Sequence, residues 1–172
     1  VLPQALAFLD QAAAGGDRKR CCLVHCELGR SRSASVVIAW LLQRRARRGQ
    51  RASLLECWAA VARTRRISAL NLGFFARLCD LEHQLCRGEH APSMTLLDYA
   101  RLPLLDRAQF AFKPVPSAGE LVAESCKDEN APEATARERA IRRLMRNLLF
   151  VLRELRAESP ACAAALEELN RP

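Results

Sequence analysis

Aromatic residues and long apolar runs are scarce in this chain of 172 residues. Aromatic side chains make up only 5% of it, so any core relies mainly on Leu, Ala and Val. No apolar run approaches the roughly 20 residues that cross a bilayer, and no secretory signal peptide opens the chain. With 50% hydrophobic residues, most of the chain is not a disordered polyelectrolyte. These features predict a soluble protein without a membrane span, located in the cytoplasm or in the nucleus.

Lysine is also rare, and the net charge of +8 is concentrated in the first half of the chain. Residues 1–90 carry 15 Arg and Lys against 7 Asp and Glu, whereas residues 91–172 carry 12 of each. A phosphorylated partner, a lipid headgroup or a nucleic acid could each use this excess. A compositional preference for arginine explains it equally well, because only three of the 27 basic residues are lysines.

Eight cysteines are numerous for this length, but their spacing does not suggest a disulfide scaffold. Most fall inside apolar patterns of helix or strand type: Cys21, Cys22, Cys26, Cys57, Cys79, Cys86, Cys126 and Cys162. We expect reduced and mostly buried thiols. Cys79, His83, Cys86 and His90 are not expected to bind a metal, because their spacing places them in a line over about 15 Å of one helix. A tetrahedral ion must be surrounded by its ligands.

Hydrophobic periodicity predicts four helices in the first half of the chain, over residues 3–14, 33–43, 54–65 and 72–86. The third and fourth helices begin at the capping residues Ser53 and Asn71. A short apolar run at 21–25 predicts a buried strand, and a loop at 26–32 joins it to the second helix. The basic residues of 44–51 predict a turn between helices.

The second half of the chain is predicted to form a connector and a helical extension. Five of the eight prolines fall within residues 88–132, which favours a partly ordered connector over 89–132. In the extension, over 133–172, apolar residues recur at helical spacing and predict an amphipathic helix over 133–157. This helix could bind calmodulin or a membrane surface. We expect it instead to dock on its own domain or to pair with a partner helix.

The segment His25-Cys26-Glu27-Leu28-Gly29-Arg30-Ser31-Arg32-Ser33 joins the predicted strand to an apolar helix. A loop with a central glycine can curl so that successive backbone N–H groups point to its centre, beside a helix N-terminus. Such a nest binds anions and stabilises a thiolate on Cys26, since thiols in such places have pKa values of roughly 3.5 to 7.5. Arg32 offers a planar fork for two phosphoryl oxygens. Ser33 places a hydroxyl near the sulfur and could ease its departure from a phosphocysteine.

This order of residues resembles the loop of the small atypical dual-specificity protein phosphatases, which are cysteine-dependent. Their loop has the pattern His-Cys-x-x-Gly-x-Ser-Arg-Ser, and each fixed position is matched from His25 to Ser33. The resemblance continues through the helix at 33–41. It includes three further segments: Leu54-Leu55-Glu56, Arg65-Arg66 and Asn71-Leu72-Gly73-Phe74. It covers about residues 1 to 88, which correspond to the C-terminal part of such a catalytic domain.

The resemblance implies an α/β fold: a partial dual-specificity-phosphatase-like domain with a central strand, a phosphate loop and several helices, followed by a helical extension. It implies a protein phosphatase that acts on phosphotyrosine and on phosphoserine or phosphothreonine, without a metal or an organic cofactor. Its catalytic residues would be Cys26, Arg32 and Ser33. Its phosphate-binding residues would be Glu27, Leu28, Gly29, Arg30, Ser31 and Arg32. His25 and Asn71 would support the loop.

The general acid is the main departure from the family pattern. The family carries this aspartate on a loop that precedes the helix predicted here at 3–14. Asp10 lies within that helix, and Asp17 lies just before the predicted strand. The strands that flank 21–25 in the family are absent as well. We therefore keep an alternative function, a phosphate-recognising pseudophosphatase or interaction module without the acid. The strand would have open edges, so we also expect marginal stability.

Two neighbours of Cys26 have alternatives that we disfavour. Cys22 could form a protective disulfide with Cys26, but strand residues four apart are separated by about 13 Å, beyond the limit of about 7 Å. His25 could act as a base, but adjacent strand residues point to opposite faces. Glu27 places a carboxylate beside the loop, which disfavours highly charged lipid headgroups.

A cluster of arginines lies between the second and third predicted helices: Arg44, Arg45, Arg47, Arg48 and Arg51. It could steer a phosphorylated acidic partner, but a solvated turn is favoured. A nucleic acid is not expected as a partner, because no aromatic residues interleave with these arginines as stacking surfaces.

Overall fold

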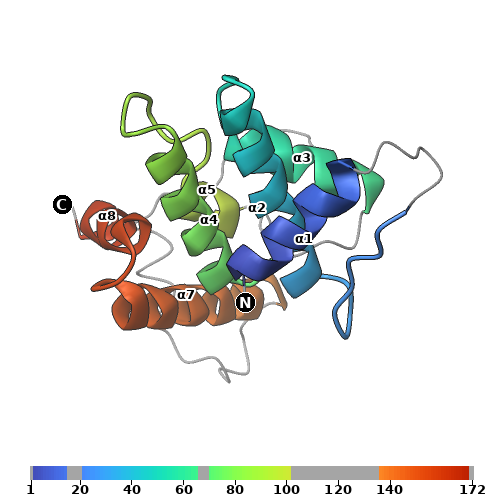
Figure 1. Cartoon of the computed structure of the whole chain (residues 1–172). Helices are drawn as coiled ribbons and strands as arrows, with labels where there is room; N and C mark the ends of the chain where they lie inside the picture. Colours follow the sequence, from blue (N-terminus) through green and yellow to red (C-terminus); the bar gives the residue numbers. More distant parts are fainter. Residues whose placement is uncertain (1, 15–20, 66–69, 102–135, 171–172) are drawn as a thin grey trace. The chain divides into compact units, whose positions relative to one another are not determined.

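The computed structural model describes residues 2–14, 21–65, 70–101 and 136–170, and every regular element in these ranges is a helix (Figure 1). The chain divides into two units, Val1–Met94 and Thr95–Pro172. None of the described helices is long and apolar enough to cross a membrane.

The first unit is built around its second helix. Its helices are α1 (Leu2–Ala14), α2 (Arg32–Arg47), α3 (Leu54–Thr64) and α4 (Leu72–Leu85). The helix α2 packs against α1, α3 and α4, and α3 also packs against α4. Ile38 and Leu42 of α2 are fully buried together with Leu54 of α3 and Phe75 of α4. The four helices predicted from the sequence are therefore confirmed, with small changes at their ends.

The largest of these changes is at the end of α2, where the prediction of a basic turn from residue 44 is wrong. The helix continues to Arg47, because arginine is a good helix former and a positive charge in the last turn favours the helix dipole. Arg45 pairs with Glu56 of α3 at 2.6 Å, and Arg47 pairs with Asp10 of α1. These arginines thus tie α2 to its neighbours.

The predicted buried strand at 21–25 is also wrong. Residues 21–26 have no regular structure, and Cys21, Cys22 and Leu23 are exposed. An apolar run forms a strand only where a neighbouring segment pairs with its backbone N–H and C=O groups. No segment of the described ranges does so here. The central strand of the expected α/β fold is therefore not found in the described residues, and the argument for instability from its open edges no longer applies.

The cysteines are less buried than their apolar surroundings suggested. The seven described cysteines are free, but only Cys57, Cys79 and Cys162 are buried. Cys126 lies outside the described residues. Burial raises the pKa of the Cys57 thiol to about 11, so this thiol is neutral and part of the core.

The predicted helix caps at Ser53 and Asn71 are confirmed. The Ser53 hydroxyl accepts a hydrogen bond from the Glu56 backbone N–H at 3.3 Å. The Asn71 side chain accepts one from the Gly73 N–H at 2.8 Å. Each cap satisfies a backbone donor that a helix start otherwise leaves without a partner.

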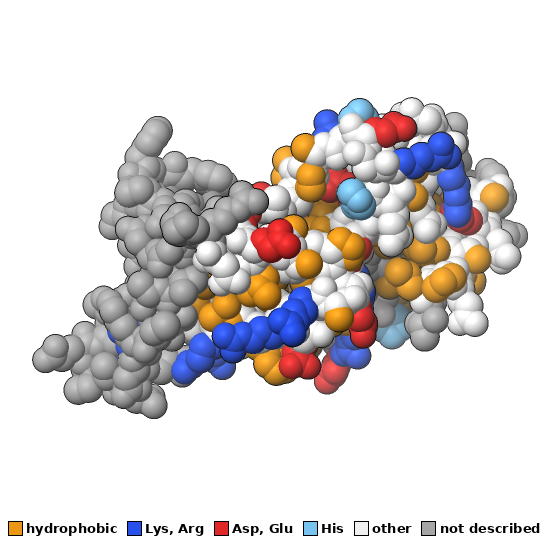
Figure 2. Space-filling model, turned by 90° about the vertical axis from the view of Figure 1, so that its left-hand side faces the viewer, with side chains coloured by type: hydrophobic (Ala, Val, Ile, Leu, Met, Phe, Trp, Pro, Cys, Tyr) orange, Lys and Arg blue, Asp and Glu red, His pale blue; other side chains and the backbone are white. Residues whose placement is uncertain are grey.

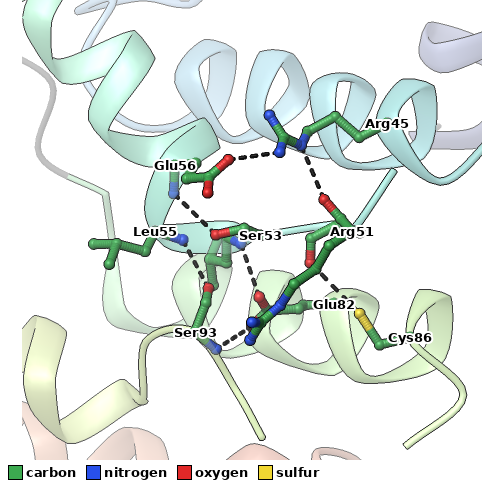
Figure 3. A network of polar contacts seen from close by, with 10 residues as sticks. Arg45, Arg51, Ser53, Leu55, Glu56, Glu82, Cys86 and Ser93 are labelled. Carbon is green, nitrogen blue, oxygen red and sulfur yellow. Dashed lines mark hydrogen bonds and ion pairs between the residues drawn. The ribbon is translucent and has the colours of Figure 1, made fainter. Parts of the chain in front are cut away.

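A buried carboxylate completes the start of α3 and joins it to α4 (Figure 3). Glu82 of α4 is only 3% exposed. Its Oε1 accepts a hydrogen bond from the Leu54 N–H at 2.8 Å, and its Oε2 accepts one from the Ser93 N–H at 3.2 Å. The Ser93 hydroxyl in turn accepts the Leu55 N–H at 2.9 Å. The first turn of α3 is therefore held by α4 and by the segment that follows it.

The second unit contains α5 (Leu96–Arg101), α7 (Ala136–Leu155) and α8 (Pro160–Leu169). The predicted apolar stripe of α7 is confirmed where its side chains are described, because Met145, Leu148 and Leu152 are buried. The helix α8 packs against both α7 and α5.

The sequence analysis missed α8 as a separate helix. Its start carries a recognisable signal, Ser159 followed by Pro160 at the first helical position. The Ser159 hydroxyl accepts the Cys162 N–H at 3.2 Å. Most of the predicted connector, residues 102–132, lies outside the described residues, and the domain boundaries stay a prediction.

Hydrophobic side chains are present at the surface as well (Figure 2). Among the described residues, the large hydrophobic side chains that are exposed are Leu2, Phe8, Leu23, Leu28, Leu55, Phe74 and Phe150. They come from several separate elements, which is common on proteins because polar atoms cannot cover the whole surface.

We expect Glu82→Gln to lower the free energy of unfolding by about 1–3 kcal/mol, because its new NH2 group faces one of the two backbone N–H donors that the carboxylate binds. Urea denaturation followed by circular dichroism measures this. Exposed Glu89 provides the control, and Glu89→Gln should change the value by less than about 0.5 kcal/mol. Equal effects of the two substitutions would contradict the conclusion that Glu82 stabilises the fold by linking α3 to α4.

The burial of one face of α7 predicts that substitutions on its two faces differ in their effect on stability. Leu152 is fully buried, whereas Phe150 is 66% exposed. We expect Leu152→Ala to lower the free energy of unfolding by about 2–5 kcal/mol, and Phe150→Ala by less than about 0.5 kcal/mol. A larger loss from Phe150→Ala than from Leu152→Ala in thermal denaturation would show that the faces are assigned the wrong way round.

Candidate active site

Cys26 begins a loop that ends at the N-terminus of α2. Its Sγ lies 3.3 Å from the Ser33 hydroxyl oxygen. The backbone N–H groups of Gly29, Ser31 and Ser33 also stabilise a negative charge on this sulfur. The loop therefore curls around the thiol, and α2 adds the positive end of its dipole.

These donors make the thiol of Cys26 acidic. The Ser33 hydroxyl has the largest effect, followed by the Ser33 N–H, and together with the N–H groups of Gly29 and Ser31 they lower the pKa of Cys26 from 9.0 to about 6. Burial opposes the shift, because desolvation disfavours a charge. At neutral pH the side chain is mainly a thiolate, which is the nucleophilic form of cysteine.

The curl of the loop requires glycine at position 29. Gly29 has a φ of +63°, and a Cβ at this position would lie 2.6 Å from a guanidinium nitrogen of Arg65. Arg65, at the C-terminal end of α3, donates from its Nε to the Gly29 carbonyl oxygen at 2.9 Å. A Cβ at this position would displace the Arg65 guanidinium, and the positive φ would strain the backbone of most other residues.

A second contact holds the loop from α4. The backbone N–H of Asn71 donates to the Ser31 hydroxyl at 2.8 Å. The Ser31 carbonyl accepts from the Ser35 N–H at 2.9 Å, within the first turn of α2. The loop is thus held at Gly29 by α3 and at Ser31 by α4. Sequence reasoning did not assign a role to Arg65, although the pair Arg65-Arg66 was part of the resemblance.

Arg32 contacts a carboxylate of its own loop. Its Nη2 donates to Glu27 Oε2 at 3.0 Å, and both side chains are exposed. Leu28, Arg30 and His25 are exposed as well. The structure therefore places Gly29, Ser31 and Ser33 around the sulfur and keeps Arg32 beside Glu27. The catalytic and binding roles of the loop residues stay predictions.

Asp10 is engaged elsewhere in the first unit. Its Oδ1 accepts a hydrogen bond from Trp40 Nε1 at 3.0 Å, and its Oδ2 pairs with Arg47. The bond from Arg47 is the main cause that lowers the pKa of Asp10. A carboxyl group held in its charged form does not supply a proton at neutral pH. The bonds to Trp40 and Arg47 instead anchor α1 to α2 through Asp10. Asp17 lies outside the described residues.

The described residues contain no group of His, Cys, Asp and Glu that could hold a metal ion. The four residues weighed above as a metal site, Cys79, His83, Cys86 and His90, are accordingly not gathered around a point. The Cys79 and Cys86 thiols instead contact the backbone oxygens of Met94 and Ala52.

The pKa of Cys26 predicts how its alkylation depends on pH. We expect the rate with iodoacetamide to rise through a midpoint near pH 6, since the thiolate forms above the lowered pKa of about 6. Ser33→Ala removes the donor with the largest effect and should move the midpoint upward. Thr64→Ala, which removes a hydroxyl that bonds carbonyls of its own helix, should leave it unchanged.

Mass spectrometry of the tryptic peptide 21–30 measures this rate, with fragmentation to separate Cys26 from Cys21 and Cys22. A midpoint near the ordinary value in the unmodified chain would contradict the proposed stabilisation of the thiolate.

Comparison with known proteins places this loop in a family. Residues 1–84 match the family model described as dual specificity phosphatase, catalytic domain. Dual specificity protein phosphatase 4 of Gallus gallus is 31% identical over 124 residues, which are 67% of this chain and 30% of that protein. Dual specificity protein phosphatase 2 of Mus musculus is 34% identical over 82 residues, which are 48% of this chain and 23% of that protein.

Dual specificity protein phosphatase 1 of Homo sapiens is 33% identical over 100 residues, which are 55% of this chain and 25% of that protein. The chain thus spans at most about a third of the length of these relatives. No solved structure matches the chain significantly. The matched residues include the loop around Cys26, all of α3 and all but the last residue of α4. The chain therefore belongs, through residues 1–84, to the dual-specificity phosphatase family.

Proposed function

We propose that this chain acts as a protein phosphatase that removes phosphate from phosphotyrosine and from phosphoserine or phosphothreonine. The observation that supports this most is the set of donors around Cys26 Sγ: three backbone N–H groups and the Ser33 hydroxyl, which lower its pKa to about 6. This arrangement provides a nucleophile at neutral pH together with a site for an anion. The family of residues 1–84 supports the same chemistry.

In the first step the Cys26 thiolate attacks the phosphorus atom of the phosphorylated side chain. A bond forms between sulfur and phosphorus, and the bond between phosphorus and the substrate oxygen breaks. The electron pair of that bond goes to the leaving oxygen, which then takes up a proton. Backbone N–H groups of the loop stabilise the charge on the phosphoryl oxygens during the transfer.

In the second step water attacks the phosphocysteine and releases inorganic phosphate. The bond between sulfur and phosphorus breaks, and its electron pair returns to sulfur as the thiolate. Ser33 suits this step because its hydroxyl is within hydrogen-bond distance of the sulfur, at 3.3 Å. A donor that stabilises the thiolate also makes it a better leaving group.

Arg32 is the proposed partner of the phosphoryl group, because its planar guanidinium can donate to two oxygens at once. Arg65 and Asn71 act indirectly in this proposal. They bond the loop at Gly29 and Ser31, and so keep the N–H groups of the loop directed toward its centre.

A phosphate-recognising module without efficient turnover is a second candidate function. The engagement of Asp10 by Trp40 and Arg47 favours it, because this carboxylate is not available to protonate the leaving group. Loss of a general acid typically slows the reaction by about 10²–10⁴-fold. The loop would still bind phosphate in this case.

Substitution of Cys26 tests the proposed phosphatase. We expect Cys26→Ser to abolish hydrolysis of 4-nitrophenyl phosphate, since a serine hydroxyl is not ionised at neutral pH. Cys22→Ser, at an exposed position four residues away, should retain it. Turnover that survives Cys26→Ser would exclude Cys26 as the nucleophile.

A comparison of leaving groups separates the two candidate functions. If the acid is missing, phenyl phosphate should be cleaved about 10²–10⁴-fold more slowly than the nitrophenyl ester, whose leaving group needs no proton. If an acid is at work, the two rates should be similar. Vanadate that protects Cys26 from alkylation without any turnover would favour the recognition module.

A further inference from the structure

Glu27 and Arg32 form an ion pair inside the loop that surrounds Cys26. The distance from Arg32 Nη2 to Glu27 Oε2 is 3.0 Å, and the two side chains are 60% and 79% exposed. Glu27 follows the nucleophile directly in the sequence, and Arg32 begins α2. The pair therefore brings a carboxylate to the side chain that the proposed function assigns to the phosphoryl group.

A carboxylate is a close chemical match for the phosphoryl group on Arg32. Both present two oxygens that the planar fork of a guanidinium can bind side by side. The N–H that Arg32 Nη2 directs at Glu27 cannot be directed at a phosphoryl oxygen at the same time. A phosphate that enters the loop must therefore displace the carboxylate or share the guanidinium with it.

We propose that Glu27 is an internal competitor for Arg32 and so sets the affinity of the loop for phosphate. This inference rests on the proposed function, in which Arg32 binds the phosphoryl group. Glu27 acts through Arg32 as a positioning residue and takes no part in the transfer itself. It holds the guanidinium against its own carboxylate and weakens the binding of phosphate by the free energy needed to break the pair.

The test compares the binding of vanadate to the chain with and without the charge of Glu27. Glu27→Gln keeps the size of the side chain and removes its charge. Glu56→Gln is the matched control, because Glu56 pairs with Arg45 at 2.6 Å in a partly exposed ion pair between α2 and α3, outside the loop. Binding is measured as protection of Cys26 from iodoacetamide, at a pH above the Cys26 pKa of about 6.

We expect Glu27→Gln to lower the vanadate concentration for half protection by about two- to fivefold. This change corresponds to the usual free energy of an exposed ion pair. Glu56→Gln should leave this concentration unchanged. The alkylation rate without vanadate is measured for each variant, so that a change in the reactivity of the thiol is not mistaken for a change in binding. An unchanged or higher concentration for Glu27→Gln would overturn the inference.

A double-mutant cycle with Arg32→Ala shows whether Glu27 acts through Arg32. In the Arg32→Ala background, Glu27→Gln should no longer lower the vanadate concentration for half protection. A complete loss of protection in that background, with or without Glu27→Gln, gives the same result. An equal gain in both backgrounds would assign the effect to charge repulsion alone and overturn the inference, while the proposed function would stand. Vanadate that protects no form of the chain would overturn both.

Discussion

The candidate active site depends on the hydrogen bonds of the buried Glu82 carboxylate, which link α3 to α4. The carboxylate ties the start of α3 to the third turn of α4 through the Leu54 N–H. The far end of α3 carries Arg65, and the near end of α4 carries Asn71, and both of these residues hold the loop around Cys26. Because helices are stiff, the register set at Glu82 decides where these two contacts lie.

The loop divides its chemistry between backbone and side chains. Backbone N–H groups and the Ser33 hydroxyl lower the pKa of Cys26 to about 6, so this thiol is charged at neutral pH because of the curl of the chain. Arg32 is paired with Glu27. Ionisation of the sulfur therefore depends on backbone geometry, whereas the proposed capture of a phosphate depends on an exposed side chain that already has a partner.

Charged residues around this site serve the fold as much as the chemistry. Asp10 bonds Trp40 and Arg47, and Arg45 bonds Glu56, so the basic end of α2 is joined to α1 and α3. The family match ends at residue 84, within α4, while the chain continues into a second helical unit with its own buried stripe on α7. The arginines at the end of α2 therefore have a structural use within the first unit, since they join its helices.

The sequence alone determined the helices of the first unit, apart from the end of α2, and the caps at Ser53 and Asn71, because these depend on neighbours within a few positions. It did not reveal that 21–25 is irregular and largely exposed, since an apolar run carries no information about what packs against it or pairs with it. Tertiary structure also decided the roles of Glu82 and Arg65, whose partners lie 28 and 36 positions away. Such contacts arise only when the packing of helices brings distant residues together.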